Sequence, residues 1–244
     1  MIHTDPVTTD MAPSDRETTP AEIQRLDVRE PWKPYRAIYE VIRALRGRAV
    51  GSLIEVITRN DKGLLTDLRT WCEATGNELV ASQPETVDAV RSLIRKGEPK
   101  LRDRTMTAII STASLEHVLF PLEKAVAAAV LGMGVNVAFE GAGVRLLKRG
   151  YRSRLSGMVG GTFTPMVERV MRRQIGWPLP QESIVILEDL GARFYVCGPS
   201  MAGYGVHEDE LIVGKYTIGA VVTWADLLAR SDIHVFSKAQ FEKP

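Results

Sequence analysis

The chain has 244 residues, of which 45% are hydrophobic and 25% charged, the balance of an ordinary globular protein with one large or two small domains. Lysine and arginine (31) nearly equal aspartate and glutamate (30), so no global charge directs the chain to nucleic acid or to a membrane surface. The two cysteines are too few for a disulfide scaffold, and the most apolar stretch, at 125–139, is too short to span a bilayer.

The first 20 residues are rich in threonine, proline and acidic side chains and lack an apolar core. We therefore interpret residues 1–20 as a flexible tail and not as an export signal. Without an export signal or a spanning segment, we expect a cytoplasmic protein with reduced cysteines and no stable membrane insertion.

The first half of the chain mixes strand and helix patterns. In chain order these predict a strand at 22–28, a helix at 35–45, a strand at 52–58, a helix starting at 64 and a short strand at 78–81. The stretch 84–97 is ambiguous, because its apolar spacing favours a helix while its β-branched residues would also suit a strand. Residues 98–104 are polar and rich in turn formers, which indicates a linker between two domains.

The second half alternates strands with helices, which predicts a parallel sheet covered by helices on both faces. Predicted strands lie at 106–111, 135–139, 193–197, 220–223 and 233–236. Predicted helices lie at 115–130, 144–149, 165–174, 181–190, 208–211 and 224–229. The stretch 150–164 contains four glycines and little periodicity, so we expect a mobile loop there and consider it a candidate gate.

Cys197 is the sharpest candidate for chemistry. It ends an apolar strand pattern and precedes a Gly-Pro-Ser turn, and reactive groups in open parallel sheets gather beyond the carboxyl ends of the strands. The turn with Gly198, Ser200 and Met201 is expected to aim backbone amides at a sulfur anion and to stabilise the reactive thiolate. The alternative is a buried cysteine that packs as a small hydrophobe, which is the commoner fate of this residue type.

The other candidate residues give weaker signals. Cys72 follows Trp71 on the apolar face of a predicted helix, where core packing is the favoured interpretation. Glu140 and His207 are candidate neighbours of Cys197, although a surface helix cap is the favoured role of His207. Histidines and cysteines lack the spacing of a zinc site, and no phosphate-binding or dinucleotide motif occurs, so we expect no metal and no cofactor.

Sequence motifs in the second half resemble a known family. The segments 132–141 (GMGVNVAFEG) and 194–201 (FYVCGPSM), followed by 210–212 (ELI) and 219–220 (GA), resemble the DsrE/DsrF-like family in motif, order and spacing. This resemblance implies a flavodoxin-like domain with a parallel sheet, often part of an oligomer, that takes part in sulfur transfer. It also implies that Cys197 carries a persulfide.

The first half is similar to the TusA sulfur-carrier family, through 26–29 (LDVR), 71–72 (WC), 76–79 (GNEL) and 92–97 (SLIRKG). The similarity implies a two-layer α/β domain whose last strand is 92–97, so it replaces the helix prediction there. TusA proteins carry sulfur on the cysteine of a Cys-Pro motif, whereas Lys33 precedes Pro34 here. Because lysine cannot hold a persulfide, we interpret 21–97 as a TusA-like domain without its carrier cysteine, kept for docking, for oligomerisation or as a remnant.

Basic residues gather on both sides of the stretch 150–164. A solvated face is the favoured interpretation, and a docking surface for an acidic protein or an anionic sulfur donor is the alternative. These residues are Arg145, Lys148, Arg149, Arg152, Arg154, Arg169, Arg172 and Arg173.

The leading hypothesis is a sulfur relay protein or sulfurtransferase with a TusA-like domain at 21–97 and a DsrE-like domain at 105–244. Cys197 would take sulfur from a persulfide, a polysulfide or a thiosulfate-derived species and pass it to an acceptor thiol. The expected partners are sulfur-donor and sulfur-acceptor proteins and further copies of the chain in a homo-oligomer, without nucleic acid. Two alternatives are a non-catalytic binding or redox-regulatory protein with a structural or sensing cysteine and a nucleotide-binding flavodoxin relative.

Overall fold

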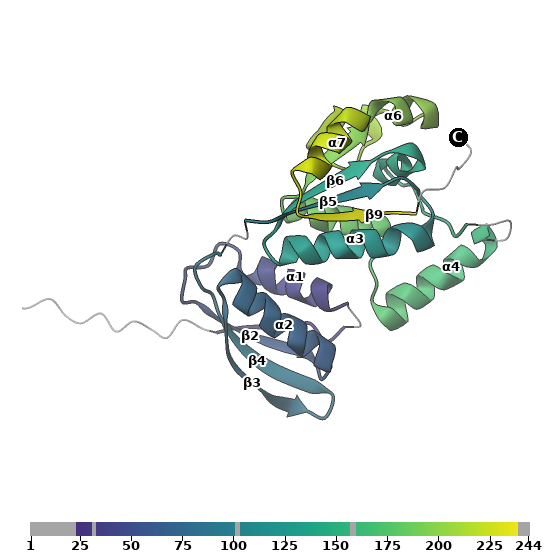
Figure 1. Ribbon diagram of the computed structural model, residues 1–244. Helices are drawn as coiled ribbons and strands as arrows, with labels where there is room; N and C mark the ends of the chain where they lie inside the picture. Colours follow the sequence, from purple (N-terminus) through teal and green to yellow (C-terminus); the bar gives the residue numbers. More distant parts are fainter. Residues whose placement is uncertain (1–22, 31–32, 101–102, 157–159, 239–244) are drawn as a thin grey trace, which may run out of the picture.

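The computed structural model describes residues 23–30, 33–100, 103–156 and 160–238. These residues form two α/β halves that lie against each other, each built around its own sheet (Figure 1). No helix within the described ranges is both long and apolar enough to cross a membrane.

The first half is a four-stranded sheet with two helices on one face (Figure 1). Its elements are β1 (Gln24–Asp27), α1 (Pro34–Leu45), β2 (Leu53–Arg59), α2 (Lys62–Thr75), β3 (Glu78–Thr86) and β4 (Ala89–Arg95). The strand order is β1-β2-β4-β3, with β1 parallel to β2 and the other neighbours antiparallel. Pro34 begins α1 and Gly76 ends α2 in a left-handed conformation, as their positions in the sequence suggest.

The stretch 84–97 forms strands, so the helix that its apolar spacing favours is wrong. Residues 84–86 end β3, a turn follows at Val87 and Asp88, and the chain returns as β4. Strand β4 pairs with β2 on one side and with β3 on the other. Burial alternates along it, and the side chains of Val90, Ser92 and Ile94 are buried. The strand alternative for this stretch is confirmed.

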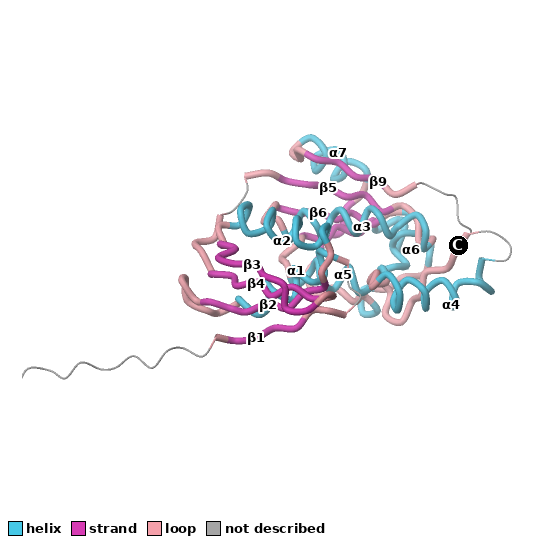
Figure 2. Tube along the Cα trace, turned by 90° about the horizontal axis from the view of Figure 1, so that it is seen from below, coloured by secondary structure: helices cyan, strands magenta, loops and turns pink. Residues whose placement is uncertain are grey.

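The second half is a five-stranded parallel sheet between two helical layers. Its elements are β5 (Thr105–Ile110), α3 (Leu115–Val130), β6 (Gly134–Phe139), η1 (Gly141–Leu147), α4 (Gly160–Val170), η2 (Met171–Ile175), α5 (Pro180–Asp189), β7 (Arg193–Cys197), α6 (Gly198–Tyr204), η3 (Glu208–Glu210), β8 (Tyr216–Gly219), α7 (Val221–Ala229) and β9 (Ile233–Phe236). Helices α3 and α7 lie on opposite sides of β5 (Figure 2). The predicted fold class is therefore confirmed.

The strand order of this sheet is β8-β7-β6-β5-β9. Counted within the second half it is 4-3-2-1-5, which differs from the 2-1-3-4-5 order of flavodoxin itself. The likeness to flavodoxin thus concerns the class, a parallel sheet between helices, and not the strand order.

Four predicted elements of the second half need correction. The strand expected at 220–223 is wrong, because β8 ends at Gly219 and α7 starts at Val221. The expected loop at 150–164 is wrong in its last part, since Gly160 begins α4, while residues 157–159 lie outside the described residues. The helical pieces expected at 144–149 and 208–211 are 3-10 helices at 141–147 and 208–210.

Lys33 fixes one end of α1 to the second half. Its Nζ lies 4.0 Å from the centroid of the Trp177 ring and 3.8 Å from the Glu123 carboxylate. Its amide donates a hydrogen bond of 3.3 Å to the carbonyl of Gly176. The position at which the TusA similarity would place a carrier cysteine is therefore engaged in a contact between the two halves.

Asp189, at the end of α5, holds the other end of α1. Its carboxylate accepts hydrogen bonds from Arg46 (2.8 and 3.0 Å) and from the Tyr39 hydroxyl (2.9 Å). The Arg46 hydrogen bonds, followed by that of Tyr39, hold the pKa of Asp189 below its usual value of 3.8 despite partial burial. This contact therefore stabilises the fold above that value, and the contribution is lost as the pH falls through the lowered pKa.

Replacing Lys33 with alanine is expected to lower the free energy of unfolding by about 1 kcal/mol, through loss of the cation–π contact with Trp177 and of a weak ion pair. Urea unfolding followed by circular dichroism measures the change. Lys62→Ala is the matched control, because Lys62 lies exposed at the start of α2. Equal stability of the two variants would contradict a stabilising role for the Lys33 contact.

Candidate functional site

The carboxyl ends of four parallel strands meet beside Cys197. Ser111 follows β5, Glu140 follows β6, Cys197 ends β7 and Ala220 follows β8. A cavity of about 550 Å³ opens at this edge of the sheet, where open parallel sheets generally bind their ligands. It is lined by Ser111, Glu140, Gly141, Cys197, Pro199, Ser200, Tyr204, Ala220, Val221 and Trp224.

Cys197 is partly exposed and lines this cavity. Alternation along β7 places Tyr195 and Cys197 on the face covered by α7, against the buried Trp224. The intervening Phe194 and Val196 are buried on the opposite face of the sheet. The thiol thus packs against an apolar wall on one side and faces the cavity on the other, so it is not enclosed in the core.

The turn after Cys197 is the start of a short helix. Cys197 stands at the N-cap of α6, but no amide of residues 198–201, all of them described, donates a hydrogen bond to its sulfur. The Ser200 hydroxyl instead accepts a hydrogen bond of 2.9 Å from the Gly141 amide, which joins α6 to η1. Met201 is buried in the core. Of the residues predicted to stabilise an anion, Ser200 lines the cavity and Gly198 is next to the cysteine.

Glu140 contributes a fixed carboxylate to the cavity wall. The Ser111 hydroxyl donates a hydrogen bond to its Oε1 at 2.8 Å, and the Trp224 indole N–H donates one to its Oε2 at 2.7 Å. Both oxygens are therefore engaged, one by a residue that follows β5 and the other by a residue of α7. The sequence suggests Glu140 as a neighbour of Cys197, and the structure brings both into the same cavity.

Sequence reasoning did not assign Ser111 and Trp224 to the site. Ser111 shows no hydrolase motif, and Trp224 has the pattern of a core aromatic residue. The signal that could have found Ser111 is its place directly after a strand, at the edge where Cys197 and Glu140 also lie.

The remaining candidates lie elsewhere. His207 is exposed and is not among the residues that line the cavity; its amide donates to Glu210 at 3.1 Å at the start of η3. Cys72 is 1% exposed in α2, and burial, with a smaller effect of Glu73, raises the pKa of its thiol to about 12. Cys72 therefore stays protonated at neutral pH and packs as a core residue, as its helical position indicates.

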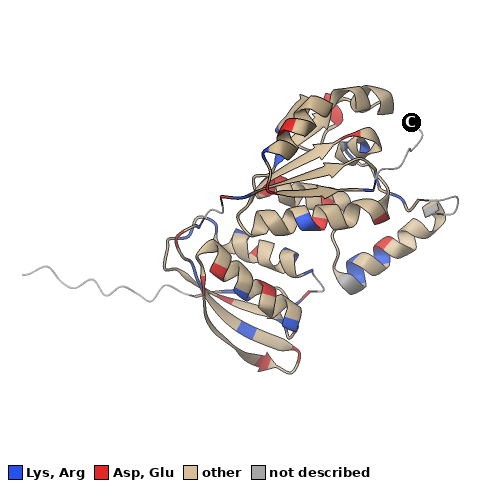
Figure 3. Cartoon of the chain, viewed as in Figure 1, with Lys and Arg blue, Asp and Glu red and all other residues tan. Residues whose placement is uncertain are grey.

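Two of the basic residues beside the stretch 150–164 are paired with acidic ones. Lys148 lies 2.9 Å from Glu210, and Arg172 lies 2.6 Å from Glu182. Acidic and basic residues are interspersed along the elements of both halves (Figure 3). These pairs support the interpretation of a solvated face. Within the described residues, no three histidine, cysteine, aspartate or glutamate side chains cluster as they would around a metal ion.

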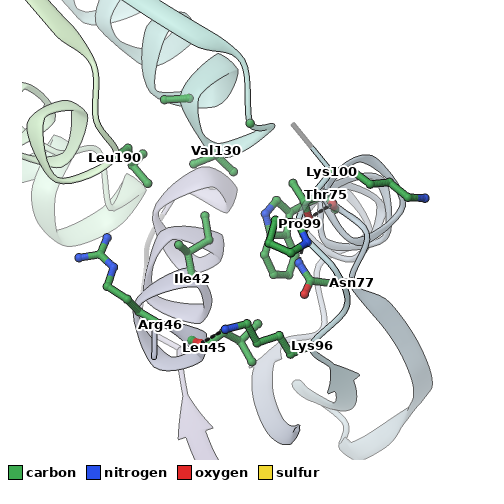
Figure 4. A pocket seen from close by; sticks show the side chains of 13 residues that line it. Ile42, Leu45, Arg46, Thr75, Asn77, Lys96, Pro99, Lys100, Val130 and Leu190 are labelled. Carbon is green, nitrogen blue, oxygen red and sulfur yellow. Dashed lines mark hydrogen bonds between the residues drawn. The ribbon is translucent and has the colours of Figure 1, made fainter. Parts of the chain in front are cut away.

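A second cavity, of about 280 Å³, lies between the two halves of the chain (Figure 4). Ile42, Val130 and Leu190 form apolar walls, and the Lys100 side chain points away from the space between them (Figure 4). The Lys96 ammonium donates to the carbonyl of Leu45 at 3.1 Å. This cavity holds no cysteine, histidine or carboxylate, so the chemistry of the described residues points to the Cys197 cavity.

A known protein family matches the second half of the chain. Residues 107–236 match the model of the DsrE/DsrF-like family. Among solved structures, the chain is similar to the ychN protein from E. coli, with 14% identity and a TM-score of 0.41 over 55% of this chain and 99% of that one. No curated protein matches the chain.

Proposed function

The chain belongs to the DsrE/DsrF-like family, whose model matches more than half of it, and on this premise we propose that it is a sulfur relay protein that carries a persulfide on Cys197. The family supports a role in sulfur relay. The observation that supports this particular residue is that Cys197 is a free, partly exposed thiol in a cavity, whereas Cys72 is buried and protonated.

The proposed reaction consists of two thiol exchange steps. The Cys197 thiolate attacks the outer sulfur of a donor persulfide, a bond forms between the two sulfurs, and the donor leaves as a thiolate. An acceptor thiolate then attacks the outer sulfur now held on Cys197, and Cys197 leaves as a thiolate. One sulfur atom moves in each step without a change in its oxidation state, so no external oxidant or reductant is needed.

The proposal extends to partners and assembly. Sulfur-donor and sulfur-acceptor proteins would exchange sulfur with Cys197 in the cytoplasm, and a homo-oligomer would present several such sites. We propose that the first half is a TusA-like domain that no longer carries sulfur and instead serves for docking. The contact of Lys33 with Trp177 supports this, because it joins the first half to the second at the position of the missing cysteine.

Persulfide formation on Cys197 is the direct test. The reduced protein is incubated with polysulfide and its intact mass is measured, with an expected gain of one or more sulfur atoms. Cys197→Ser should lose this gain almost completely, and Cys72→Ala is the matched control that should retain it. A thiol that stays unmodified in the wild-type protein with polysulfide, thiosulfate and an organic trisulfide would contradict the proposal and favour a binding or redox-sensing role.

A further inference from the structure

The carboxylate of Glu140 lines the same cavity as Cys197 and gives that cavity a negative charge. We infer that Glu140 is a specificity-determining residue: it disfavours dianionic sulfur compounds such as thiosulfate and selects organic persulfides as donors. The inference rests on the proposed function, which makes sulfur donors the substrates of Cys197. It restricts the kinds of donor from which Cys197 takes sulfur. It follows from the charges, the hydrogen bonds and the rim of the cavity.

Glu140 is the one acidic residue among the ten that line the cavity, and no lysine, arginine or histidine is among these described residues. Arg145 lies nearby, but its guanidinium stacks 4.8 Å from the centroid of the Tyr204 ring, and Tyr204, not Arg145, lines the cavity. An anion that approaches Cys197 is thus repelled by the Glu140 carboxylate, and no cationic side chain in the cavity lining offsets this repulsion. The repulsion is twice as large for a dianion as for a monoanion at the same distance.

The carboxylate is held in place and cannot readily turn away from an approaching anion. Ser111 and Trp224 donate to its two oxygens at 2.8 and 2.7 Å. Trp224 is 4% exposed, so one wall of the site is apolar and screens charge less than water does. This arrangement keeps a negative charge in the lining of the cavity that also contains Cys197.

The rim of the cavity is apolar and exposed, which suits an organic group. Val221 lines the cavity and is 75% exposed, and the next residue, Val222, is 79% exposed. Ile218, half exposed, lies against Gly198, since a Cβ built there would be 3.1 Å from its Cγ2. A donor whose sulfur is attached to a carbon chain can bury that chain on this rim, whereas thiosulfate has no such group.

The test compares two disulfide reagents that label Cys197, neutral dithiodipyridine and dianionic dithiobis(nitrobenzoate). Their rate ratio cancels any change in the thiolate fraction, and Cys197→Ser gives the background. Glu140→Gln should raise the rate of the dianion relative to that of the neutral reagent by about tenfold. Asp209→Asn removes the same charge from an exposed site outside the lining and should leave the ratio within about twofold.

Ionic strength gives a second measurement. In the wild-type protein, added salt should accelerate the dianion and leave the neutral reagent unchanged. The acceleration should be smaller in Glu140→Gln, because only the thiolate then repels the dianion. An unchanged ratio of the two labelling rates in folded Glu140→Gln would overturn the inference. A wild-type rate of labelling by the dianion that does not change with salt would also overturn it. So would equal persulfide loading from thiosulfate and from an organic persulfide, an outcome that leaves the relay proposal intact. A shifted ratio without persulfide loading from any donor would instead reject the relay and retain the charge effect.

Discussion

Gly97→Ala is expected to lower the free energy of unfolding by about 4 kcal/mol or more. A Cβ at position 97 would lie 1.6 Å from the carbonyl oxygen of Gly76 and 2.6 Å from its carbonyl carbon. Both colliding groups are backbone, so no side chain can rotate to relieve the overlap. The backbone must move apart where the chain leaves β4 and crosses the turn between α2 and β3.

This crossing is also fixed by hydrogen bonds. The Gly97 amide donates to the Asn77 side chain at 3.1 Å, and Asn77 in turn donates to the Thr75 hydroxyl at 2.9 Å. Gly76 adopts a φ of +84°, which favours glycine at the end of α2. Since the buried residues of both halves form one continuous core, a displaced crossing also weakens the packing of α1 on α3.

Urea unfolding followed by circular dichroism measures the Gly97→Ala effect. Gly203→Ala is the control, because a Cβ at this helical position in α6 meets nothing within 4 Å. The control should be neutral or stabilise the protein by up to about 1 kcal/mol. If Gly97→Ala were as stable as this control, the two backbone segments would not approach each other as closely as described.

The hydrophobic pattern predicted most elements because most helices and strands here bury one face. The hairpin at 84–97 was missed by that pattern, since its turn at Val87 and Asp88 has no glycine or asparagine and Val87 is 89% exposed. Because valine is apolar, Val87 matches one position of the apolar spacing expected of a helix, although its side chain is exposed in the turn. The strand expected at 92–97 from the TusA resemblance overlaps β4, which runs from Ala89 to Arg95.

The strand predicted at 220–223 failed for a related reason. Val221, Val222 and Thr223 have the residue types of a strand but begin a helix, and the two valines are exposed. A Cβ on Gly219 would lie 2.8 Å from the Thr223 hydroxyl oxygen, which shows how tightly the chain turns from β8 into α7. Local propensity could not reveal a helix that begins directly after this tight turn.

Only those residues of the candidate site that lie at the carboxyl ends of strands could be predicted from the sequence. Cys197 and Glu140 each follow from their place at the carboxyl edge of the sheet. Trp224 meets Glu140 across 84 positions of sequence, through the packing of α7 on the sheet, and no spacing rule indicates that pair. The predicted amide contacts to the Cys197 sulfur are not made: Cys197 stands at the N-cap of α6 without a side-chain hydrogen bond to the helix amides.

Trp224→Ala is expected to lower the free energy of unfolding by about 3 to 5 kcal/mol, because it removes the largest side chain of the small core between α7 and the sheet. Trp224 packs there with the buried Ile109, Ala138 and Leu227, and Cys197 lies at the edge of the same cluster. Without the ring, the α7 wall of the cavity loosens. The Cys197 thiol should then react about tenfold faster with neutral dithiodipyridine.

Trp224→Phe separates packing from hydrogen bonding at this position. Phenylalanine keeps most of the ring contacts but cannot donate to Glu140, so the expected loss is smaller, about 1 to 2 kcal/mol. Val222→Ala on the exposed side of α7 is the control and should change stability by less than about 0.5 kcal/mol. Equal losses for Trp224→Ala and Trp224→Phe would mean that the ring contacts add nothing. The wall beside Cys197 would then depend on the hydrogen bond to Glu140 alone.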